Sequence, residues 1–532
     1  MKKFIVYISI LCLILNLSAQ KEKIKAPKAP FKITNEQMYE DYDQFLKIIE
    51  TYNAQWEIRK KYTGYDMLST LKKRRNEIEK IENYWEFINF MDKSLNFIID
   101  VHADQRPVFY DIPHPRYAPG QSFYDSTYIA EIATGFEQYL NYKGSKISYK
   151  DYLQTIGAKY LDGNYYMSSY YIFKNHKTGD SICFQNARII AYDHQPIDLY
   201  IKNSIGDMSP YSVRWDFKNN KYYTNKMFIS YNKTLKVEGD DGKFYEFIPN
   251  NYGIKIQTFH QEEYRKNPQS YFDLYKKWNP QRISYLPEQK ILYIYTKMME
   301  GQEEYNLIDS IKSIGKGKQI EKIVIDVRGN QGGGDNFWSA MLSAIIKDTL
   351  HFQDRVALNY NDEVRAYFNA EFPVEMTKEF KMMEIPFLGN KKMLVREPIC
   401  QIDPDTNSLQ YDGPIYLFQD EETYSSGHSF TSLARQIPQL ISMGVSTGMM
   451  AGFGFNPWGF QLKNSRFTFN FEPAIDLSMT NKWEDSFQCI PEIEVNPTIE
   501  EWNIYKLYHD ITPLNEFLVQ HDYLFKKVLE LK

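Results

Sequence analysis

The chain has 532 residues, a formal net charge of -5, 43% hydrophobic residues and 25% charged residues. This length allows about three domains. Because basic and acidic residues are mixed along the chain, no basic stripe is present that could neutralise phosphates, and nucleic acid is not an expected partner. The 43 Tyr and 34 Phe residues suit a packed protein with apolar grooves.

The N-terminus is typical of a secretory signal peptide, which we place at residues 1–19. Two lysines precede an apolar stretch from Phe4 to Leu15, and small residues follow it. The stretch is shorter than the roughly 20 residues that a membrane-spanning helix needs. We therefore expect export to the periplasm or beyond the cell, with no integral membrane segment after cleavage.

A lysine- and proline-rich leader, expected to be flexible, follows at residues 20–33. A helical region is predicted over residues 34–110. Thr34 is its expected N-cap with Gln37 three positions later, and apolar residues follow at helical spacing. A second helical pattern runs from Trp85 to Ile98.

Residues 150–260 contain short aromatic and branched runs separated by turn signals, which predicts a mainly β domain. Within it, "GDSI" and "AYDHQPIDLYI" distantly resemble part of a PDZ domain, interrupted by an apolar insertion. The region is therefore either a degenerate PDZ-like module, which would capture peptides by strand addition, or a β spacer.

From residue 285 apolar strands alternate with helical patterns, as in "KILYIYT", "NLIDSIKSI", "EKIVIDVRG" and "NFWSAMLSAIIK". This alternation predicts βαβ units around a buried sheet, in an α/β domain over residues 285–500. Short helices are expected over residues 501–532.

Cysteine and histidine spacing gives no sign of a disulfide framework or a metal site. After signal removal three scattered cysteines are left, so at most one bridge could form. No histidines are paired at metal-ligand spacing, so we assign no metal and no cofactor.

The stretch "DEETYSSGHSF" lies directly after the apolar run "GPIYLFQ", so Ser425 and Ser426 fall on a turn between a strand and a helix. A serine there points into a cleft, and the N–H groups at the start of the helix can bind an oxyanion. The alternative is that both serines only cap the helix.

A second loop, "DVRGNQGGGDNFW", brings Gly332, Gly333 and Gly334 to the end of another strand, where α/β sheets place ligands. A nucleotide loop is the competing interpretation, but no "GxxxxGK[ST]" or "GxGxxG" motif is present. Glycine-rich turns alone are weak evidence for a site.

Together, "DVRGNQGGG", "TYSSG" and "CIPEIEV" resemble, in order, three signatures of the tail-specific, or C-terminal processing, serine peptidases. The resemblance spans about residues 320–500. It implies a crotonase-like or Clp-protease-like spiral α/β catalytic domain. It also implies Ser425 as nucleophile, with oxyanion donors at the N–H of Ser426 and at a glycine of the Gly332 and Gly333 pair.

The base departs from the better-known branch of that family, which places a lysine about 25 residues after the nucleophile. Here "GVSTGMMAGFG" has no lysine, and Lys463 lies too far along. The branch that includes the tricorn core protease and the chlamydial protease-like activity factor uses histidine and glutamate instead. By that resemblance His102 in "DVH" is the base.

The orienting acid implied by the same resemblance is Glu484, with Asp485 as the fallback. A serine, a histidine and a glutamate fit the rule of nucleophile, base and orienting acid. His428 lies one turn after Ser425 and is a weaker alternative base.

These observations predict an exported serine endopeptidase that acts on peptides or proteins. Trp338 and Phe453 are expected to line the substrate groove or to pack in the core. The alternatives are a catalytically inactive relative that binds peptides or protein partners, and an acyl-transferring or lyase enzyme on the same fold. Oligomeric state and substrate preference leave no signal in the sequence.

Overall fold

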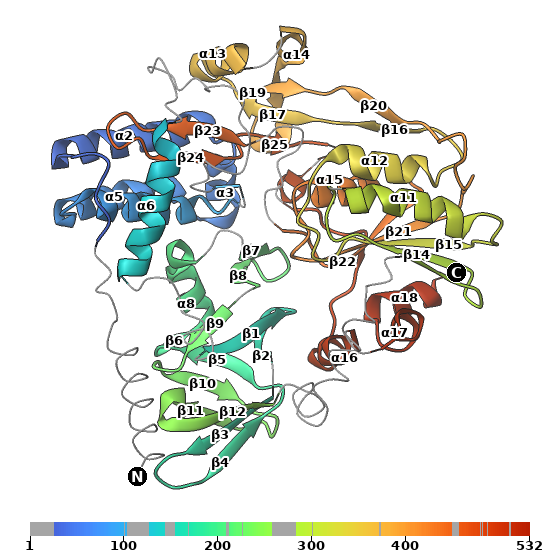
Figure 1. Ribbon diagram of the computed structural model, residues 1–532, viewed down its shortest axis with the longest axis horizontal. Helices are drawn as coiled ribbons and strands as arrows, with labels where there is room; N and C mark the ends of the chain where they lie inside the picture. Colours follow the sequence, from blue (N-terminus) through green and yellow to red (C-terminus); the bar gives the residue numbers. More distant parts are fainter. Residues whose placement is uncertain are drawn as a thin grey trace, which may run out of the picture.

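The computed structural model describes residues 26–100, 102–103, 127–143, 155–168, 170–208, 212–225, 227–257, 283–300, 302–371, 374–448, 457–478, 480, 482–486, 488–509 and 512–531. A helical N-terminal part, a β-rich middle part and an α/β part followed by C-terminal helices are arranged around the centre of the molecule (Figure 1). The predicted signal peptide, residues 1–19, lies outside the described residues.

The N-terminal part is helical, as predicted. Its α-helices are α2 (Asn35–Tyr52), α3 (Trp56–Thr63), α4 (Met67–Arg74), α5 (Tyr84–Leu95) and α6 (Thr127–Lys143). The Thr34 hydroxyl accepts a hydrogen bond from the Gln37 N–H, and the Gln37 side chain accepts one from the Thr34 N–H. This capping box confirms the predicted start of α2.

A hairpin from far along the chain completes the core of this helical part. Its strands are β23 (Trp458–Gln461) and β24 (Thr468–Phe471), which pair antiparallel. Phe469 packs edge-on against Phe45 of α2 at 5.2 Å between ring centroids, and both side chains are fully buried. Residues that the sequence assigns to the α/β domain therefore belong to the N-terminal core.

The middle part is mainly β, as predicted. Its elements are β1 (Thr155–Leu161), β2 (Asn164–Met167), β3 (Tyr170–Asn175), β4 (Ser181–Phe184), β5 (Arg188–Tyr192), β6 (Gln195–Pro196), α8 (Ile197–Asn203), β7 (Val213–Asp216), β8 (Lys221–Thr224), β9 (Met227–Ser230), β10 (Leu235–Glu238), β11 (Phe244–Phe247) and β12 (Tyr252–Gln257). One sheet runs β11-β10-β5-β2-β1-β9, with β6 paired to β5, and a second runs β12-β3-β4. The PDZ-like character of this part stays a prediction.

The central sheet of the α/β part is built from strands that the sequence predicts as buried. The order is β13-β14-β15-β21-β22-β26, and all neighbours are parallel except β13 and β14. The strands are β13 (Ile283–Leu286), β14 (Ile291–Tyr295), β15 (Lys322–Asp326), β21 (Ile415–Gln419), β22 (Leu440–Gly444) and β26 (Ile493–Glu494).

Helices cover both faces of this sheet, which explains why its strands are apolar throughout. Ile323 and Ile325 pack toward one group of helices, α11 (Gln302–Gly315), α12 (Asp335–Ser343) and α15 (Ser426–Ser432). Val324 and Phe418 pack toward the C-terminal helices. These are α16 (Ile499–His509), α17 (Leu514–Gln520) and α18 (Tyr523–Glu530).

A smaller sheet, ordered β18-β19-β17-β25, and a two-stranded ribbon of β16 and β20 complete the α/β part. Their bounds, with the adjacent helices, are β16 (Leu350–Gln353), β17 (Val356–Asn359), α13 (Asp362–Glu371), α14 (Val374–Glu379), β18 (Lys381–Ile385), β19 (Lys391–Arg396), β20 (Ile399–Ile402) and β25 (Ile475–Asp476). These elements lie at the top of Figure 1.

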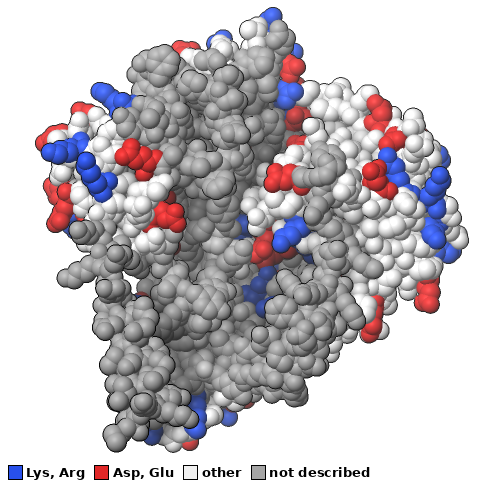
Figure 2. Space-filling view, in the orientation of Figure 1, with Lys and Arg blue, Asp and Glu red and all other residues white. Residues whose placement is uncertain are grey.

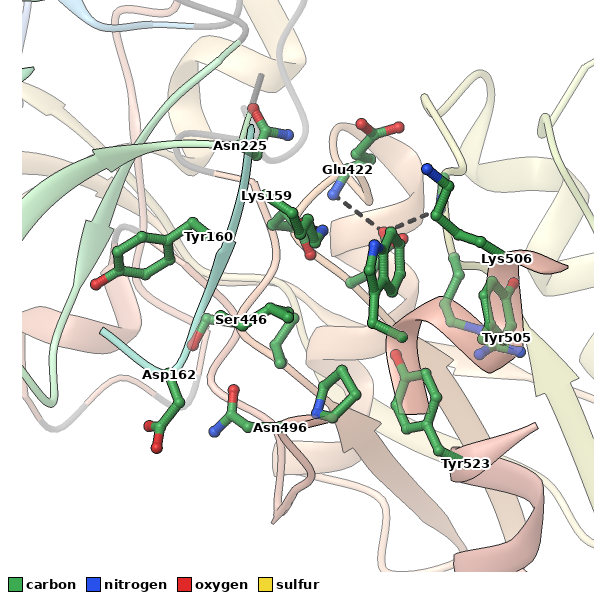
Figure 3. A pocket seen from close by; sticks show the side chains of 18 of the residues that line it. Lys159, Tyr160, Asp162, Asn225, Glu422, Ser446, Asn496, Tyr505, Lys506 and Tyr523 are labelled. Atoms are coloured by element: carbon green, nitrogen blue, oxygen red, sulfur yellow. Dashed lines mark hydrogen bonds and ion pairs between the residues drawn. The ribbon is translucent and has the colours of Figure 1, made fainter. Parts of the chain in front are cut away.

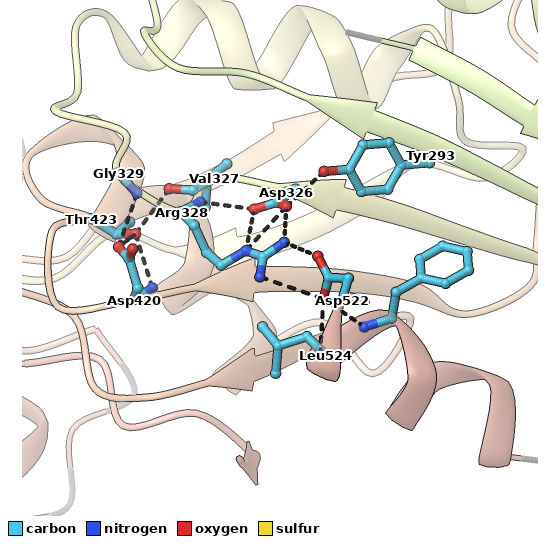
Figure 4. Close-up of polar contacts among 10 residues, drawn as sticks. Tyr293, Asp326, Val327, Arg328, Gly329, Asp420, Thr423, Asp522 and Leu524 are labelled. Carbon is cyan, nitrogen blue, oxygen red and sulfur yellow. Dashed lines mark hydrogen bonds and ion pairs between the residues drawn. The ribbon is translucent and has the colours of Figure 1, made fainter. Parts of the chain in front are cut away.

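A buried ion triad joins the end of β15 to the C-terminal helices. The Arg328 guanidinium donates to Asp326 at 2.5 Å and to Asp522 at 2.6 Å, and all three side chains are at most 7% exposed (Figure 4). Burial acts to lower the pKa of Arg328, but the two carboxylates outweigh it and raise that pKa well above its usual value. The arginine is therefore charged and fixes two acids.

We expect Arg328→Met to lower the free energy of unfolding by about 3–5 kcal/mol, because it leaves two buried carboxylates uncompensated. Urea unfolding measures the change. Arg75→Met is the matched control, because Arg75 pairs with Asp43 at the surface and should change stability by less than about 1 kcal/mol. Equal effects of the two substitutions would contradict a structural role of the triad.

A second prediction concerns the pH dependence of stability. Burial raises the pKa of Asp354, between β16 and β17, to about 6, with Arg396 opposing the shift and Asp476 and Asp335 adding to it. The folded state then binds the proton more tightly than the unfolded state, so stability falls as pH rises from about 4 to 6. Asp354→Asn should remove about 3 kcal/mol of that fall.

Melting temperatures of wild type and Asp354→Asn at pH 4 and pH 7 test this expectation. The variant should gain stability relative to wild type at the higher pH. Parallel pH profiles for the two proteins would refute it.

Both signs of charge are interspersed on the face in Figure 2. Cys183, Cys400 and Cys489 are all free thiols. In the described ranges, no helix has both the length and the apolar character required to cross a membrane.

Candidate active site

Ser425 occupies a strained turn between β21 and α15. Its backbone lies at φ 55° and ψ -131°, a region that non-glycine residues rarely adopt. Its side chain makes no capping hydrogen bond to the helix that it precedes. The capping alternative therefore does not account for Ser425, and backbone strain of this kind is concentrated at functional sites.

Side-chain and backbone hydrogen bonds tie this turn to the loop after β15. The Asp420 carboxylate accepts from the Gly329 N–H at 2.9 Å, and the Thr423 hydroxyl donates to the Val327 carbonyl at 2.9 Å (Figure 4). The Tyr424 N–H donates to the Asn330 carbonyl at 3.0 Å. The two glycine- and serine-containing loops that the sequence singled out are thus held together at the carboxyl edge of the sheet.

Gly332 lies directly against Ser425. A Cβ atom on Gly332 would stand 2.5 Å from the Ser425 Cβ and 2.9 Å from the Ser426 backbone nitrogen, and the φ angle of Gly332 is 94°. Only glycine fits here without strain. The predicted contact between the glycine loop and the serine turn is present.

The two glycines differ in what their N–H groups do. The Gly332 N–H donates to the Asn330 side chain at 2.8 Å. The backbone of Met299 forms hydrogen bonds with the Gly332 carbonyl and with the Gly334 N–H. The Gly333 N–H, which lies between them, has no hydrogen bond among the described residues. Of the predicted pair, Gly333 therefore has the N–H that is available for a further hydrogen bond.

The hydroxyl of Ser426 is already engaged. It donates to Asp335 at 2.6 Å, and the indole N–H of Trp338 donates to the same carboxylate oxygen at 3.0 Å. Burial raises the pKa of Asp335. The N–H of Ser426, by contrast, is the first of α15 and lies among the N–H groups that a helix leaves without an internal partner.

His428 is a buried residue with both ring nitrogens facing partners. Nδ1 lies 2.8 Å from the Thr447 hydroxyl and Nε2 lies 3.8 Å from Asp476, and the side chain is 2% exposed. Burial lowers the pKa of His428, against the opposing effect of Asp476. Both ring nitrogens of His428 therefore face side chains other than that of Ser425.

The segment of His102 is anchored to the hairpin of β23 and β24. Asp100 is fully buried and accepts from the His102 N–H at 2.8 Å and from the Glu472 N–H at 2.6 Å. Asn470 donates to the His102 carbonyl at 3.0 Å. The imidazole Nδ1 lies 3.9 Å from Asp100.

Two buried acids of this segment and the hairpin, Asp100 and Glu472, both have raised pKa values. Burial is the main cause that raises the pKa of Asp100, and burial together with the charge of Asp100 raises the pKa of Glu472 well above its usual value. One Glu472 oxygen is buried without a hydrogen-bond partner among the described residues.

Glu484 lies in a 3₁₀ turn (Trp483–Ser486) that is held in place by Trp483, whose ring stacks on Tyr62 at 4.5 Å. Its Oε2 atom is buried and has no hydrogen-bond partner among the described residues. The fallback acid, Asp485, accepts at its backbone carbonyl from Arg435. Glu484 thus has a carboxylate oxygen free to receive an imidazole N–H.

Of the two residues expected at a groove or in the core, Trp338 is the one that the structure describes. Trp338 is 4% exposed and stacks on Phe430 at 6.0 Å, so it packs in the core. Phe453 lies outside the described residues. Lys463 lies in the turn between β23 and β24, where its N–H contacts Gln44 of α2.

The structure brings Gly332, Ser425 and Ser426 into direct contact. His102 contacts Asp100 and Asn470, and its approach to Ser425 stays a prediction, as does that of Glu484. Sequence reasoning missed the carboxylate of Asp335, because a single acid at a helix start carries no pattern that points to a serine elsewhere in the chain.

Residues 290–500 match the family model described as peptidase family S41. Similar solved structures include a CPAF mutant (12% identity, 93% of this chain and 98% of that chain covered, TM-score 0.49) and the photosystem II D1 C-terminal processing protease (11%, 87% and 94%, TM-score 0.35). The tricorn protease is also similar (12%, 93% and 36%, TM-score 0.33). No curated protein sequence matches the chain. The matched range contains both loops that meet at Ser425.

Proposed function

Because residues 290–500 form a serine-type peptidase domain of family S41, we propose that the protein is an exported endopeptidase with Ser425 as its nucleophile. The observation that supports this choice is the strained turn at Ser425, whose side chain is not used as a cap and against which Gly332 is packed. The neighbouring Ser426 is a weaker candidate, because Asp335 holds its hydroxyl.

In the proposed reaction the Ser425 oxygen attacks the peptide carbonyl while His102 accepts its proton. His102 then returns that proton to the leaving amine, so the acyl-enzyme forms without net loss of a proton. Glu484 orients the imidazole. A serine hydroxyl needs such a base because it is a weak nucleophile at neutral pH.

The oxyanion is proposed to lie between the N–H groups of Ser426 and Gly333. The Ser426 N–H starts α15, where the helix dipole favours negative charge. Gly333 is preferred to Gly332 because Asn330 already accepts from the Gly332 N–H. Water that attacks the acyl-enzyme completes hydrolysis by the same steps.

A fluorophosphonate probe tests the triad. The folded wild-type protein should be labelled at Ser425, and His102→Gln should slow labelling by about 100- to 10,000-fold. Glu484→Gln should also slow it, whereas the neighbouring Asp485→Asn should not. A folded wild-type protein that remains unlabelled at every pH would reject the peptidase mechanism, and the reverse order of the two acid variants would move the orienting role to Asp485.

Export rests on the sequence of residues 1–19. If the signal is removed as proposed, the mature protein begins near Gln20. Mass spectrometry of the N-terminus of protein purified from the producing cell checks this, and an intact Met1 would contradict it.

A further inference from the structure

Residues of the β-rich middle part of the chain bind the turn that carries Ser425. Glu421, four residues before Ser425, forms an ion pair with Lys159 of β1. The backbone carbonyl of the same residue accepts from the Arg214 Nε atom of β7 at 3.0 Å. Two cations from the middle part thus hold one residue of the nucleophile turn, by its side chain and by its backbone.

These interactions with Glu421 are shielded from water. The side chains of Lys159 and Glu421 are 13% and 11% exposed, and Arg214 is 1% exposed. The Lys159 ammonium also lies 4.2 Å from the centre of the Trp502 ring of α16. Removing one partner of a shielded ion pair leaves the other charge uncompensated. It therefore costs far more stability than removing one partner of a surface pair.

Glu421 and Ser425 belong to the same turn, so the backbone of that turn connects them directly. On one side of it Asp420 holds the Gly329 N–H, and on the other Thr423 holds the Val327 carbonyl. A shift of Glu421 therefore moves the residues that hold the serine turn and the glycine loop together.

An open space lies beside the interactions of Lys159 and Arg214 with Glu421, and it would allow the turn that carries Ser425 to move. A cavity of about 740 Å³ lies between the middle part, the end of the central sheet and the C-terminal helices, and its walls include Lys159, Asp420, Glu421 and Glu422. Figure 3 shows Lys159 and Lys506 at this cavity. Ser425, Ser426 and Gly333 are not among its lining residues, so the cavity is separate from the proposed nucleophile and oxyanion donors.

We propose that Lys159 and Arg214 are positioning residues, which clamp Glu421 so that the β-rich part sets the geometry of Ser425. Neither residue contacts the reacting atoms. The proposal rests on the proposed function of Ser425 as nucleophile. It makes the activity of the α/β domain depend on a correctly seated middle part.

Kinetics of matched variants test the clamp. Lys159→Met should lower kcat roughly 10- to 100-fold with KM nearly unchanged, because a small displacement of the nucleophile costs rate rather than binding. Glu421→Gln, which keeps the size of the side chain, should lower kcat in the same way, and Lys159→Arg should restore most of the rate. Lys218→Met is the control, since Lys218 lines the same cavity but pairs with Asp162 in solvent.

Hydrogen exchange of the segment 420–430 gives a readout that does not need activity. The segment should exchange faster in Lys159→Met and Glu421→Gln than in wild type or Lys218→Met. Unchanged exchange and unchanged kcat in both clamp variants would overturn the proposal, as would an equal loss in the control. If no protein, wild type included, hydrolyses peptides or reacts with the probe, the proposed function fails, and exchange alone decides the clamp.

Discussion

Ser425→Ala is expected to abolish peptide hydrolysis, with a loss of about a million-fold in kcat if the triad acts as a unit. Alanine keeps the backbone at the same positive φ angle, so the melting temperature should change little. Hydrolysis of a peptide library, followed by mass spectrometry, measures the loss. The same variant should no longer react with the fluorophosphonate probe.

Ser426→Ala is the matched control for this experiment. It removes the hydroxyl that Asp335 holds but keeps the backbone N–H that is proposed to bind the oxyanion. The expected cost is about 1–2 kcal/mol of stability from the lost hydrogen bond to a buried acid, with activity largely retained. A Ser426→Ala variant as inactive as Ser425→Ala would mean that the nucleophile has been assigned to the wrong serine.

Gly332→Ala is expected to lower kcat by at least about 100-fold. The new Cβ would meet the Ser425 Cβ at 2.5 Å, and the backbone nitrogen of Ser426 at 2.9 Å, so the serine turn must shift. Both the nucleophile and an oxyanion donor would be displaced by the same methyl group. Steady-state kinetics and probe labelling measure the effect.

Gly317→Ala separates this clash from the cost of the backbone conformation. Gly317 also has a positive φ, of 71°, but a Cβ there meets nothing within 4 Å. It should lose only roughly 1–2 kcal/mol of stability and keep its activity. Equal activity of the two glycine variants would show that Gly332 does not approach the reacting atoms.

Local patterns in the sequence were sufficient for much of the fold. The strands β14 and β15 and the helices α11 and α12 follow from apolar runs and helical spacing within about 60 residues, because each pattern reports burial along its own element. The start of α2 follows from Thr34 and Gln37 alone. That the Gly332 loop lies beside the Ser425 turn was implied by the resemblance to the tail-specific peptidases, and in the structure the two loops follow the paired parallel strands β15 and β21.

Contacts between residues that are far apart in the sequence could not be predicted from local patterns. Trp458 is fully buried and stacks on Tyr367 at 4.3 Å, because its hairpin belongs to the N-terminal core, which its local sequence does not indicate. Lys159 and Glu421 are 262 residues apart, and either alone looks like a solvated charge. Only the folded chain reveals that they pair.

The hairpin of β23 and β24 has a consequence for biosynthesis. Phe45 of α2 can pack against Phe469 only after Phe469 has been synthesised. During synthesis, apolar side chains of the N-terminal helices therefore stay exposed until the hairpin of β23 and β24 has been translated. A truncation that removes the hairpin of β23 and β24 would leave the core of the N-terminal helices incomplete, although all of those helices would still be synthesised.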